Sequence, residues 1–184
     1  MSRLKKNLAE LLKKEPDWEP FFFDESRFGT HSKRGYGWFP KGTRPRIATK
    51  LGFQNFYLYA AVSPVSGECH SLILPFVNGT CMNSYLHDLS QTLGTRKVLL
   101  IMDGAGWHKA KHLALPHNIR LRYLPPYSPE LNPVERLWQY IKDRTIKNKI
   151  FSDLKQLEDS LCHFLSTLTP SEIISITTCQ YLYN

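Results

Sequence analysis

Two short, wholly apolar runs in the sequence each end in an aspartate. Residues 21–23 (FFF) precede Asp24, and residues 98–102 (VLLIM) precede Asp103. Uninterrupted apolar runs of this length are typical of strands that are buried on both faces of an α/β sheet. Polar sites in such sheets collect beyond the carboxyl ends of the central strands. If the two strands are parallel neighbours, Asp24 and Asp103 lie close together where the strands end.

The segments around these runs predict the rest of the domain. We expect an antiparallel hairpin over 55–74, an edge strand over 119–123, helices over 4–12, 82–93 and 109–115, and three more helices that start near 132, 154 and 170. This succession of elements describes an α/β fold with a mixed sheet flanked by helices. It divides the chain into an N-terminal helix or linker over 1–16 and one domain over 17–184.

A third acid stands at the start of a predicted helix. In Asn132-Pro133-Val134-Glu135, asparagine suits the N-cap, proline the first helical position, and glutamate the third, from which it reaches back to the N-cap amide. Glu135 borders the apolar stripe of this helix, so we expect it to approach the two aspartates. Each acid also has a structural explanation, because acids often end strands and a glutamate at this position caps a helix.

Three carboxylates that converge would form a site for hard divalent cations. Two adjacent carboxylates repel each other, so that without a cation at least one of them tends to take up a proton. Mg²⁺ and Mn²⁺ prefer oxygen ligands and leave coordination positions to water and substrate phosphates. Two such ions about 4 Å apart activate a nucleophile and stabilise the leaving oxygen in phosphodiester displacement. The three acids together therefore predict phosphodiester chemistry.

The charge of the chain points to a polyanionic partner. Lys and Arg number 24 against 16 Asp and Glu, which gives a net charge of +8 and a pI near 9.4, and nucleic acid is the polyanion we expect. No apolar run approaches the ~20 residues of a bilayer-spanning helix, so we expect no membrane contact. The four cysteines form no CxxC pair and predict neither a zinc ribbon nor a disulfide framework.

The segment over 27–46 combines basic and aromatic residues and contains no acid, and we interpret it as a long loop or loose hairpin. Its basic residues are Arg27, Lys33, Arg34, Lys41, Arg44 and Arg46, and its aromatic residues are Phe28, Tyr36, Trp38 and Phe39. This composition suits a DNA backbone and unpaired bases. A solvated loop whose aromatic side chains cover the sheet edge explains it equally well. Lys109, Lys111, Arg120 and Arg122 are candidates to extend the basic surface.

Two histidines, His108 and His112, lie four residues apart, as in the helix of a zinc protease. The residues between them are Lys-Ala-Lys, with no glutamate to act as a base, which argues against that chemistry. We expect His108 to support the acidic site or to contact a phosphate of DNA. The alternative is an ordinary surface histidine.

Three blocks of the sequence, in this order, resemble the signature blocks of the DDE transposases, in the bacterial insertion-sequence branch of the mariner-like superfamily. They are Asp24-Glu25-Ser26-Arg27-Phe28, Asp103-Gly104-Ala105-Gly106-Trp107-His108, and residues 127–138 (YSPELNPVERLW). The resemblance covers about residues 21–144 and implies an RNase H-like fold. It further implies DNA cleavage and strand transfer that depend on two Mg²⁺ or Mn²⁺ ions, with Asp24, Asp103 and Glu135 as catalytic acids and metal ligands. Of these, Asp24 would bridge the two ions.

The sequence departs from the family pattern in two respects. Gly104 follows the second acid where relatives commonly carry asparagine, and we expect no helix-turn-helix region in the residues before the domain, 1–16. Glu25 competes with Asp24 for the role of first acid, because successive strand residues point to opposite faces and only one can enter the site. The family match favours Asp24, so we expect Glu25 to face away.

The resemblance also implies partners and a location. The partners would be DNA, as element ends and as target, and a second copy of the chain in a homodimer; the location would be the cytoplasm of a bacterial host, at the nucleoid. Two other functions stay open. One is an RNase H-type nuclease without strand transfer, against which the proline-rich third block argues. The other is a non-enzymatic DNA-binding module from a decayed or domesticated element, against which the three intact acids argue.

Overall fold

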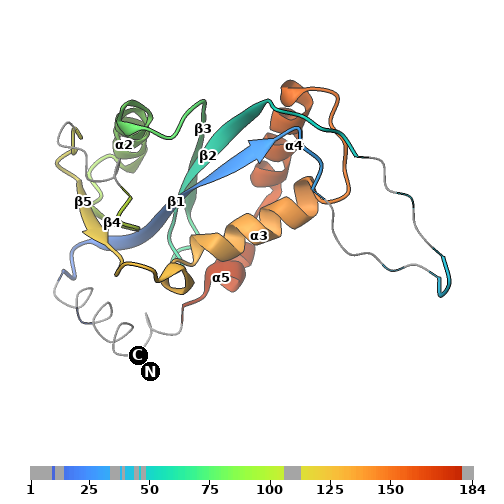
Figure 1. Cartoon of the computed structure of the whole chain (residues 1–184). Helices are drawn as coiled ribbons and strands as arrows, with labels where there is room; N and C mark the ends of the chain where they lie inside the picture. The colour runs from blue at the N-terminus through green and yellow to red at the C-terminus, as the bar shows by residue number, and fades with distance from the viewer. Residues whose placement is uncertain are drawn as a thin grey trace.

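A mixed five-stranded sheet forms the centre of the molecule (Figure 1). The computed structural model describes residues 10, 15–33, 38, 40–43, 46, 49–105 and 113–179. The strands are β1 (Glu19–Gly29), β2 (Asn55–Val62), β3 (Cys69–Leu74), β4 (Val98–Met102) and β5 (Ile119–Tyr123), and their order in the sheet is β3-β2-β1-β4-β5. The strand pairs β1–β4 and β4–β5 are parallel, whereas β1–β2 and β2–β3 are antiparallel. The expected mixed sheet is thus confirmed.

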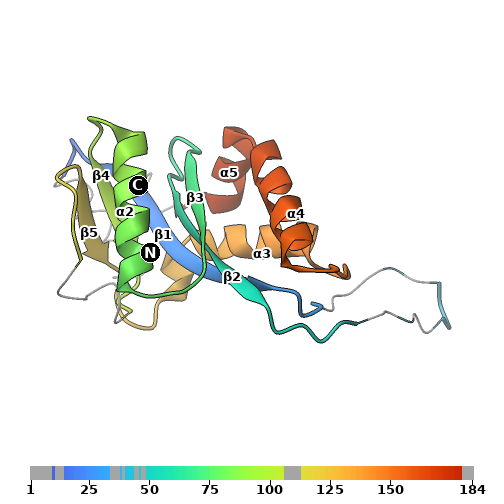
Figure 2. The ribbon, with the colours of Figure 1, turned by 90° about the horizontal axis from the view of Figure 1, so that it is seen from above.

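Helices cover both faces of this sheet. They are α2 (Gly79–Leu93), α3 (Val134–Thr145), α4 (Leu154–Thr167) and α5 (Pro170–Thr177), with a short 3₁₀ helix, η2 (Pro129–Leu131), before α3. The helix α2 lies on one face and α3 on the other, as two perpendicular views show (Figures 1 and 2). Among the described residues, no helix is long and apolar enough to cross a membrane.

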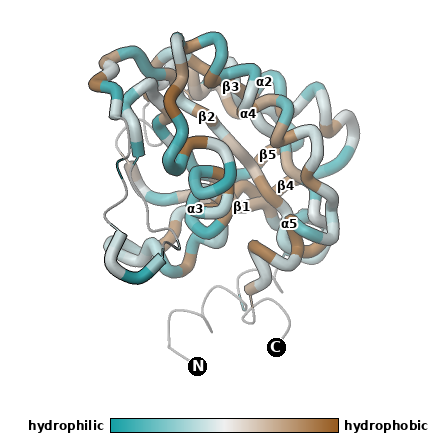
Figure 3. The backbone as a smooth tube through the Cα atoms, turned by 90° about the vertical axis from the view of Figure 1, so that its right-hand side faces the viewer, coloured by the Kyte–Doolittle hydropathy of each residue, from teal (hydrophilic) through white to brown (hydrophobic). Residues whose placement is uncertain are grey.

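Alternation along the central strands builds a separate apolar core on each face. Phe21 and Phe23 of β1 pack with α2, whereas Phe22 packs with α3, α4 and α5. In β4, Leu100 joins the α2 core and Ile101 joins the α3 core. A strand that is buried on both faces needs an uninterrupted apolar run, which explains the two runs in the sequence. Figure 3 shows these hydrophobic strands between the more hydrophilic outer helices.

Most elements confirm the sequence-based expectations. The hairpin over 55–74, the helix over 82–93 and the edge strand over 119–123 form as expected. The glycine after α2, Gly94, has a φ of 61°, a conformation that favours glycine. Apart from residue 10, the expected helix over 4–12 lies outside the described residues, as do residues 109–112 of the next one, and residues 113–115 are not helical.

The strand β1 is longer than expected, and this changes the position of Asp24. The strand continues five residues beyond Asp24 to Gly29, so residues 27–29 belong to a strand and not to a loop. The reason is that the main chain of β1 pairs with β2 from Phe22 to Gly29. This pairing does not depend on the polar side chains of residues 24–27. Two further backbone hydrogen bonds, from Thr30 to Gln54 and from Ser32 to Lys50 (both 3.1 Å), extend the hairpin.

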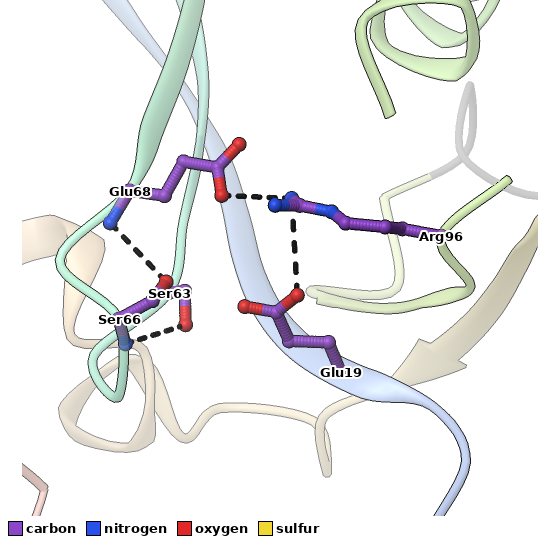
Figure 4. A network of polar contacts seen from close by, with 5 residues as sticks. All are labelled: Glu19, Ser63, Ser66, Glu68 and Arg96. Carbon is purple, nitrogen blue, oxygen red and sulfur yellow. Dashed lines mark hydrogen bonds and ion pairs between the residues drawn. The ribbon is translucent and has the colours of Figure 1, made fainter. Parts of the chain in front are cut away.

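A polar network joins the start of β1 to the turn between β2 and β3 (Figure 4). Arg96 lies 2.7 Å from the carboxylate of Glu68 and 3.8 Å from that of Glu19. The Ser63 hydroxyl accepts a hydrogen bond from the Ser66 amide at 3.2 Å and thereby shapes the turn. These contacts lie at the end of β1 opposite to the hairpin and fix the order of the strands there.

Candidate active site

The two aspartates follow the parallel pairing between β1 and β4. The last pair between β1 and β4 is Phe22 with Ile101, and Asp24 and Asp103 each come two residues later, Asp103 just after the end of β4. Because side chains alternate along a strand, Asp24 belongs to the face of Phe22, which is the α3 face. Both aspartates line one cavity of about 650 Å³. The predicted proximity of the two acids therefore has a structural basis, although Asp24 lies within a strand and not at its end.

Asp24 is held by the indole of Trp138, a contact that the sequence did not reveal. The Nε1–H of Trp138 donates a hydrogen bond of 2.9 Å to Oδ2 of Asp24. Burial raises the pKa of Asp24 to about 7; the Trp138 hydrogen bond acts in the opposite direction, and the charges of Glu135 and Glu25 raise it further. Without a cation, this carboxyl group is thus half protonated near neutral pH.

Glu135 lines the same cavity from the first turn of α3. The helix begins at Val134 with Pro133 as its N-cap, and the Asn132 amide donates to the carbonyl oxygen of Pro129 and not to Glu135, so the expected capping box is wrong. The Asn132 side chain makes two other contacts. Its Nδ2 donates a hydrogen bond of 3.0 Å to the carbonyl oxygen of Phe23, and its Oδ1 accepts one of 3.2 Å from the Val134 amide. Asn132 thereby ties the start of α3 to the residue before Asp24.

The cavity wall consists largely of the segment that leads from β5 to α3. Its lining residues outside the three acids are Gly104, Ala105, Tyr123, Leu124, Pro125, Pro126, Tyr127, Ser128, Pro129 and Asn132. Asp103 is exposed, and its Oδ1 accepts a hydrogen bond of 3.1 Å from the Ala105 amide. Tyr127 has a fully exposed ring and a φ of 56°, which is rare for a bulky residue. The sequence did not single out this tyrosine, because nothing in a sequence pattern reports its backbone strain.

Glu25 points away from the cavity, as expected. It belongs to the α2 face of β1, which also carries Tyr59. Burial is the main cause of the raised pKa of Tyr59 and of Tyr85, and the charge of Glu25 raises both pKa values further. Asp24 is therefore the acid of this pair that enters the site.

The donor set of the cavity fits hard divalent cations. The charged side chains that line it are three carboxylates, and Mg²⁺ is commonly held by one or two carboxylates together with water and substrate phosphates. In the part of the chain that the structure describes, no three His, Cys, Asp or Glu side chains are gathered tightly enough to enclose an ion by themselves. A wide cavity with three separate acids is consistent with ions that substrate oxygens help to bind.

The residues expected to bind DNA differ in their exposure, and some of them lie outside the described part of the chain. Arg27, Trp38, Lys41 and Arg46 are exposed, and Lys33 is half-buried beside Asp143. Arg34, Arg44 and His108 lie outside the described residues, as do His112, Lys109, Lys111, Tyr36 and Phe39. The aromatic ring of Phe28 is buried against Trp138 and is not available for base stacking, because Phe28 is a strand residue.

Two arginines of β5 are engaged with the chain itself. Arg120 forms an ion pair of 2.9 Å with Glu15, and Arg122 pairs with the same carboxylate. Arg120 also stacks over the ring of Trp18, 4.2 Å from its centroid. The expected extension of the basic surface to these two residues is therefore replaced by a contact that fixes the segment before β1.

Comparisons with known proteins agree with this geometry. The model of the DDE superfamily endonucleases matches residues 20–158. A protein of Sinorhizobium fredii (strain NBRC 101917 / NGR234), the uncharacterized protein y4pE/y4sA, is 37% identical over 123 residues, which are 65% of this chain and 91% of that protein. The uncharacterized 39 kDa protein of insertion element IS630 from Shigella sonnei is 30% identical over 175 residues, which are 92% of this chain and 50% of that protein.

Solved structures of the Mos1 transposase share the fold. Its paired-end complex with the left transposon end has a TM-score of 0.69 at 19% identity, over 94% of this chain and 56% of that chain. Further Mos1 paired-end complexes were solved with Mn and with Mg. This chain spans about half the length of the IS630 protein and of the Mos1 chain. The likeness confirms the RNase H-like fold, and the family match over more than half of the sequence shows that the chain belongs to the DDE superfamily of endonucleases.

Proposed function

We propose that residues 17–184 form the catalytic domain of a transposase, preceded by a helix or linker over 1–16. The domain cleaves a DNA strand and then joins the freed 3′-hydroxyl to a target strand. The observation that carries this proposal is that Asp24, Asp103 and Glu135, from three different elements, line one cavity in a member of the DDE family. The net charge of +8 suits the polyanionic substrate.

The three acids are the proposed ligands of two Mg²⁺ or Mn²⁺ ions. Asp24 contributes to both ions, and Asp103 and Glu135 each hold one. When bound, such ions activate a water or hydroxyl nucleophile and stabilise the leaving oxygen of the phosphodiester. The Mos1 complexes with Mn and with Mg support this choice of metals.

The residues around the acids set their relative positions. Trp138 fixes the carboxylate of Asp24 by its hydrogen bond, and Asn132 fixes the first turn of α3 against β1. Glu135 and Trp138 are three residues apart, so they lie on neighbouring positions of the same helix side. Glu135 is also close enough to the carboxylate that Trp138 holds for its charge to raise the pKa of Asp24. The exposed ring of Tyr127 at the cavity offers a stacking surface to an unpaired base.

The proposed DNA contacts extend from the cavity to the hairpin between β1 and β2. The residues proposed to bind DNA are Arg27, Lys33, Arg34, Trp38, Lys41, Arg44, Arg46 and His108. We further propose that two copies of the chain act together on two element ends, as a homodimer at the nucleoid of the host. The Mos1 paired-end complex, which contains a transposon end, supports DNA as the partner.

The test is cleavage of a duplex that carries the element's own ends, in the presence and absence of Mg²⁺. We expect the wild-type chain to cut the strand and join the freed end to target DNA. Asp103→Asn should lose cleavage by several orders of magnitude, whereas Asp159→Asn, which removes an exposed carboxylate on α4, should retain it.

The two other functions give different results in this assay. Cleavage without joining would identify a nuclease of the RNase H type. Binding without cleavage by the wild-type chain would identify a non-enzymatic DNA-binding module. Normal cleavage by Asp103→Asn would contradict the assignment of the acids.

A further inference from the structure

The strand β3 forms one edge of the sheet, and no other strand of the described residues pairs with its outer side. In an antiparallel ladder, residues that bond to the neighbouring strand alternate with residues whose N–H and C=O groups point away from it. The Ser63 amide donates to the Glu68 carbonyl oxygen at 2.9 Å, so every second residue from Glu68 onward bonds to β2. The residues that point outward are therefore Cys69, Ser71 and Ile73, and their main-chain groups form no hydrogen bond within the described part of the chain.

This edge lacks the features that commonly prevent a strand from pairing with another chain. Exposed edges are usually protected by charged side chains, by proline or by a covering segment. The opposite edge of the sheet, β5, carries Arg120 and Arg122, which pair with Glu15. In contrast, β3 has the sequence CHSLIL, without Asp, Glu, Lys, Arg or Pro, and burial lowers the pKa of its histidine, His70. The edge formed by β3 is therefore open to a further strand.

The distribution of charge favours a second copy of the chain as the partner. The whole chain has a net charge of +8, so two copies repel each other over most of their surface. Residues 51–95, which include β2, β3 and α2, contain no Lys or Arg and only two acids, Glu68 and Asp88. Glu68 is paired with Arg96 at 2.7 Å. Two copies can therefore approach each other at this edge with little repulsion.

The outer side of β3 is complementary to a second copy of itself. Its outward residues are spaced evenly about Ser71, so a two-fold axis at Ser71 sets two β3 strands antiparallel. Ser71 then lies opposite Ser71 of the second copy, and Cys69 lies opposite Ile73. Each of these residues meets a residue whose N–H and C=O groups also point outward, so the two strands can exchange main-chain hydrogen bonds.

A cavity beside the edge can receive a side chain of the second copy. It has a volume of about 220 Å³ and is lined by Cys69 and Ser71 together with apolar residues at the junction of α4 and α5, namely Leu165, Leu168, Pro170 and Ile173. Cys69 and Ile73 both pack on the α3 side of the sheet, and residues that lie opposite each other share a face. In the symmetric pair, Ile73 of the second copy therefore lies beside Cys69, at this cavity.

We propose that two copies of the chain associate by antiparallel pairing of their β3 strands, which joins the two five-stranded sheets into one continuous sheet. This inference rests on the proposed function, of which it names the surface that holds the homodimer together. Strand addition of this kind obtains affinity from main-chain hydrogen bonds and specificity from side-chain pockets. Both acidic cavities stay open, because no residue of β3 lines them.

Disulfide cross-linking of the full chain tests the register. Residues opposite each other in a hydrogen-bonded antiparallel pair have Cα atoms about 5.5 Å apart, a distance that a disulfide spans. Ser71→Cys, combined with Cys162→Ser to remove an exposed native cysteine, should therefore give a covalent dimer on mild oxidation. Gln91→Cys in the same Cys162→Ser chain places an exposed thiol on α2 and should stay monomeric under the same denaturing electrophoresis.

Sedimentation velocity over a range of protein concentrations measures the association itself. Ser71→Lys places two positive charges directly opposite each other and should weaken dimerisation at least about fivefold. An equal mixture of Ser71→Lys and Ser71→Glu chains should associate again, because opposite charges then face each other. Gln91→Lys adds the same charge on the exposed side of α2 and should dimerise as the wild type does. If Ser71→Lys loses its thermal transition, Ser71→Glu alone replaces it and should show the same weakening.

The outcomes separate this inference from the proposed function. A wild-type chain that is monomeric at every concentration, or a dimer that Ser71→Lys and Gln91→Lys form equally well, refutes the pairing of β3. If such a chain still cleaves and joins end-bearing DNA, the transposase proposal stands. A chain that forms the Ser71→Cys cross-link but whose wild type neither cleaves nor joins end-bearing DNA would overturn the proposed function and leave the interface in place.

Discussion

Asp24 combines two conditions that oppose each other, a buried position and a negative charge. Its pKa of about 7, raised first by burial from an ordinary value of 3.8, means that the folded chain retains a proton that the unfolded chain loses near pH 4. Between about pH 4 and 7 the contribution of Asp24 to the free energy of unfolding of the metal-free protein should therefore fall as pH rises. The full difference corresponds to an effect on the order of 4 kcal/mol.

This pH dependence is measured by urea unfolding in EDTA from pH 4.5 to 8. Asp24→Asn cannot titrate, so the difference in stability between wild type and this variant should decrease with rising pH and level off above pH 7. Parallel pH profiles for the two proteins would show that Asp24 is not buried in the way described.

The hydrogen bond from Trp138 gives a second prediction at this scale. Trp138→Phe keeps the apolar ring but removes the donor, so Asp24 loses the bond that lowers its pKa. Protons should then compete better with a cation, and the pH at which Mn²⁺ binding reaches half its maximum should rise. Calorimetric titration at several pH values measures this midpoint. The matched control is Trp18→Phe, because Trp18 packs on Arg120 near β5; an equal shift in both variants would refute the positioning role.

The three acids could be named from the sequence, whereas Trp138 could not. An aspartate after an apolar run and a glutamate at a helix start are visible as patterns. Trp138 belongs to the apolar stripe of its helix and fills that role in the core as well. Its polar contact depends on which strand residue lies opposite the helix, and this is a tertiary property that no local pattern encodes.

At the scale of elements, the sequence predicted the centre of the sheet better than its margins. β4 was predicted fully because each of its residues is buried. The extent of β1 was underestimated because residues 24–27 (DESR) interrupt the apolar pattern while their main chain still pairs with β2. The helix α3 starts at Val134, with Pro133 and not Asn132 as its N-cap, and the Asn132 side chain bonds both to β1 and to the Val134 amide. In both places backbone or long-range hydrogen bonds, which leave no periodic signal, decide the structure.

Asn132 is the residue that tests the junction between β1 and α3. It is buried, and Asn132→Ala removes a donor to Phe23 and an acceptor for the Val134 amide, which leaves both backbone groups without these partners. We expect a loss of about 2 kcal/mol in the free energy of unfolding. Asn132→Asp keeps the acceptor but not the donor and should be intermediate in this respect. Urea denaturation measures the series, and a loss below about 0.5 kcal/mol for alanine would contradict the bridging role.

Apolar packing on both faces of the sheet stabilises the whole molecule. Two apolar cores, one on each face of the sheet, hold the strands and helices together, and Trp138 of the α3-side core also bonds to Asp24. A domain with cores of this size needs no structural ion to fold, unlike a small zinc domain. Removal of an acid from the site should therefore leave the fold intact, and it relieves repulsion among carboxylates. Variants of the three acids are consequently suitable for a binding measurement.

The central claim is that Asp24, Asp103 and Glu135 form one metal site, and Mn²⁺ titration of the metal-free chain by calorimetry tests it most directly. Asp24→Asn, Asp103→Asn and Glu135→Gln should each weaken Mn²⁺ binding at least about tenfold while keeping the thermal transition of the wild type, and Asp159→Asn should bind as the wild type does. If any one of the three acid variants binds Mn²⁺ with wild-type affinity, that acid is not a ligand and the account of a shared site is wrong.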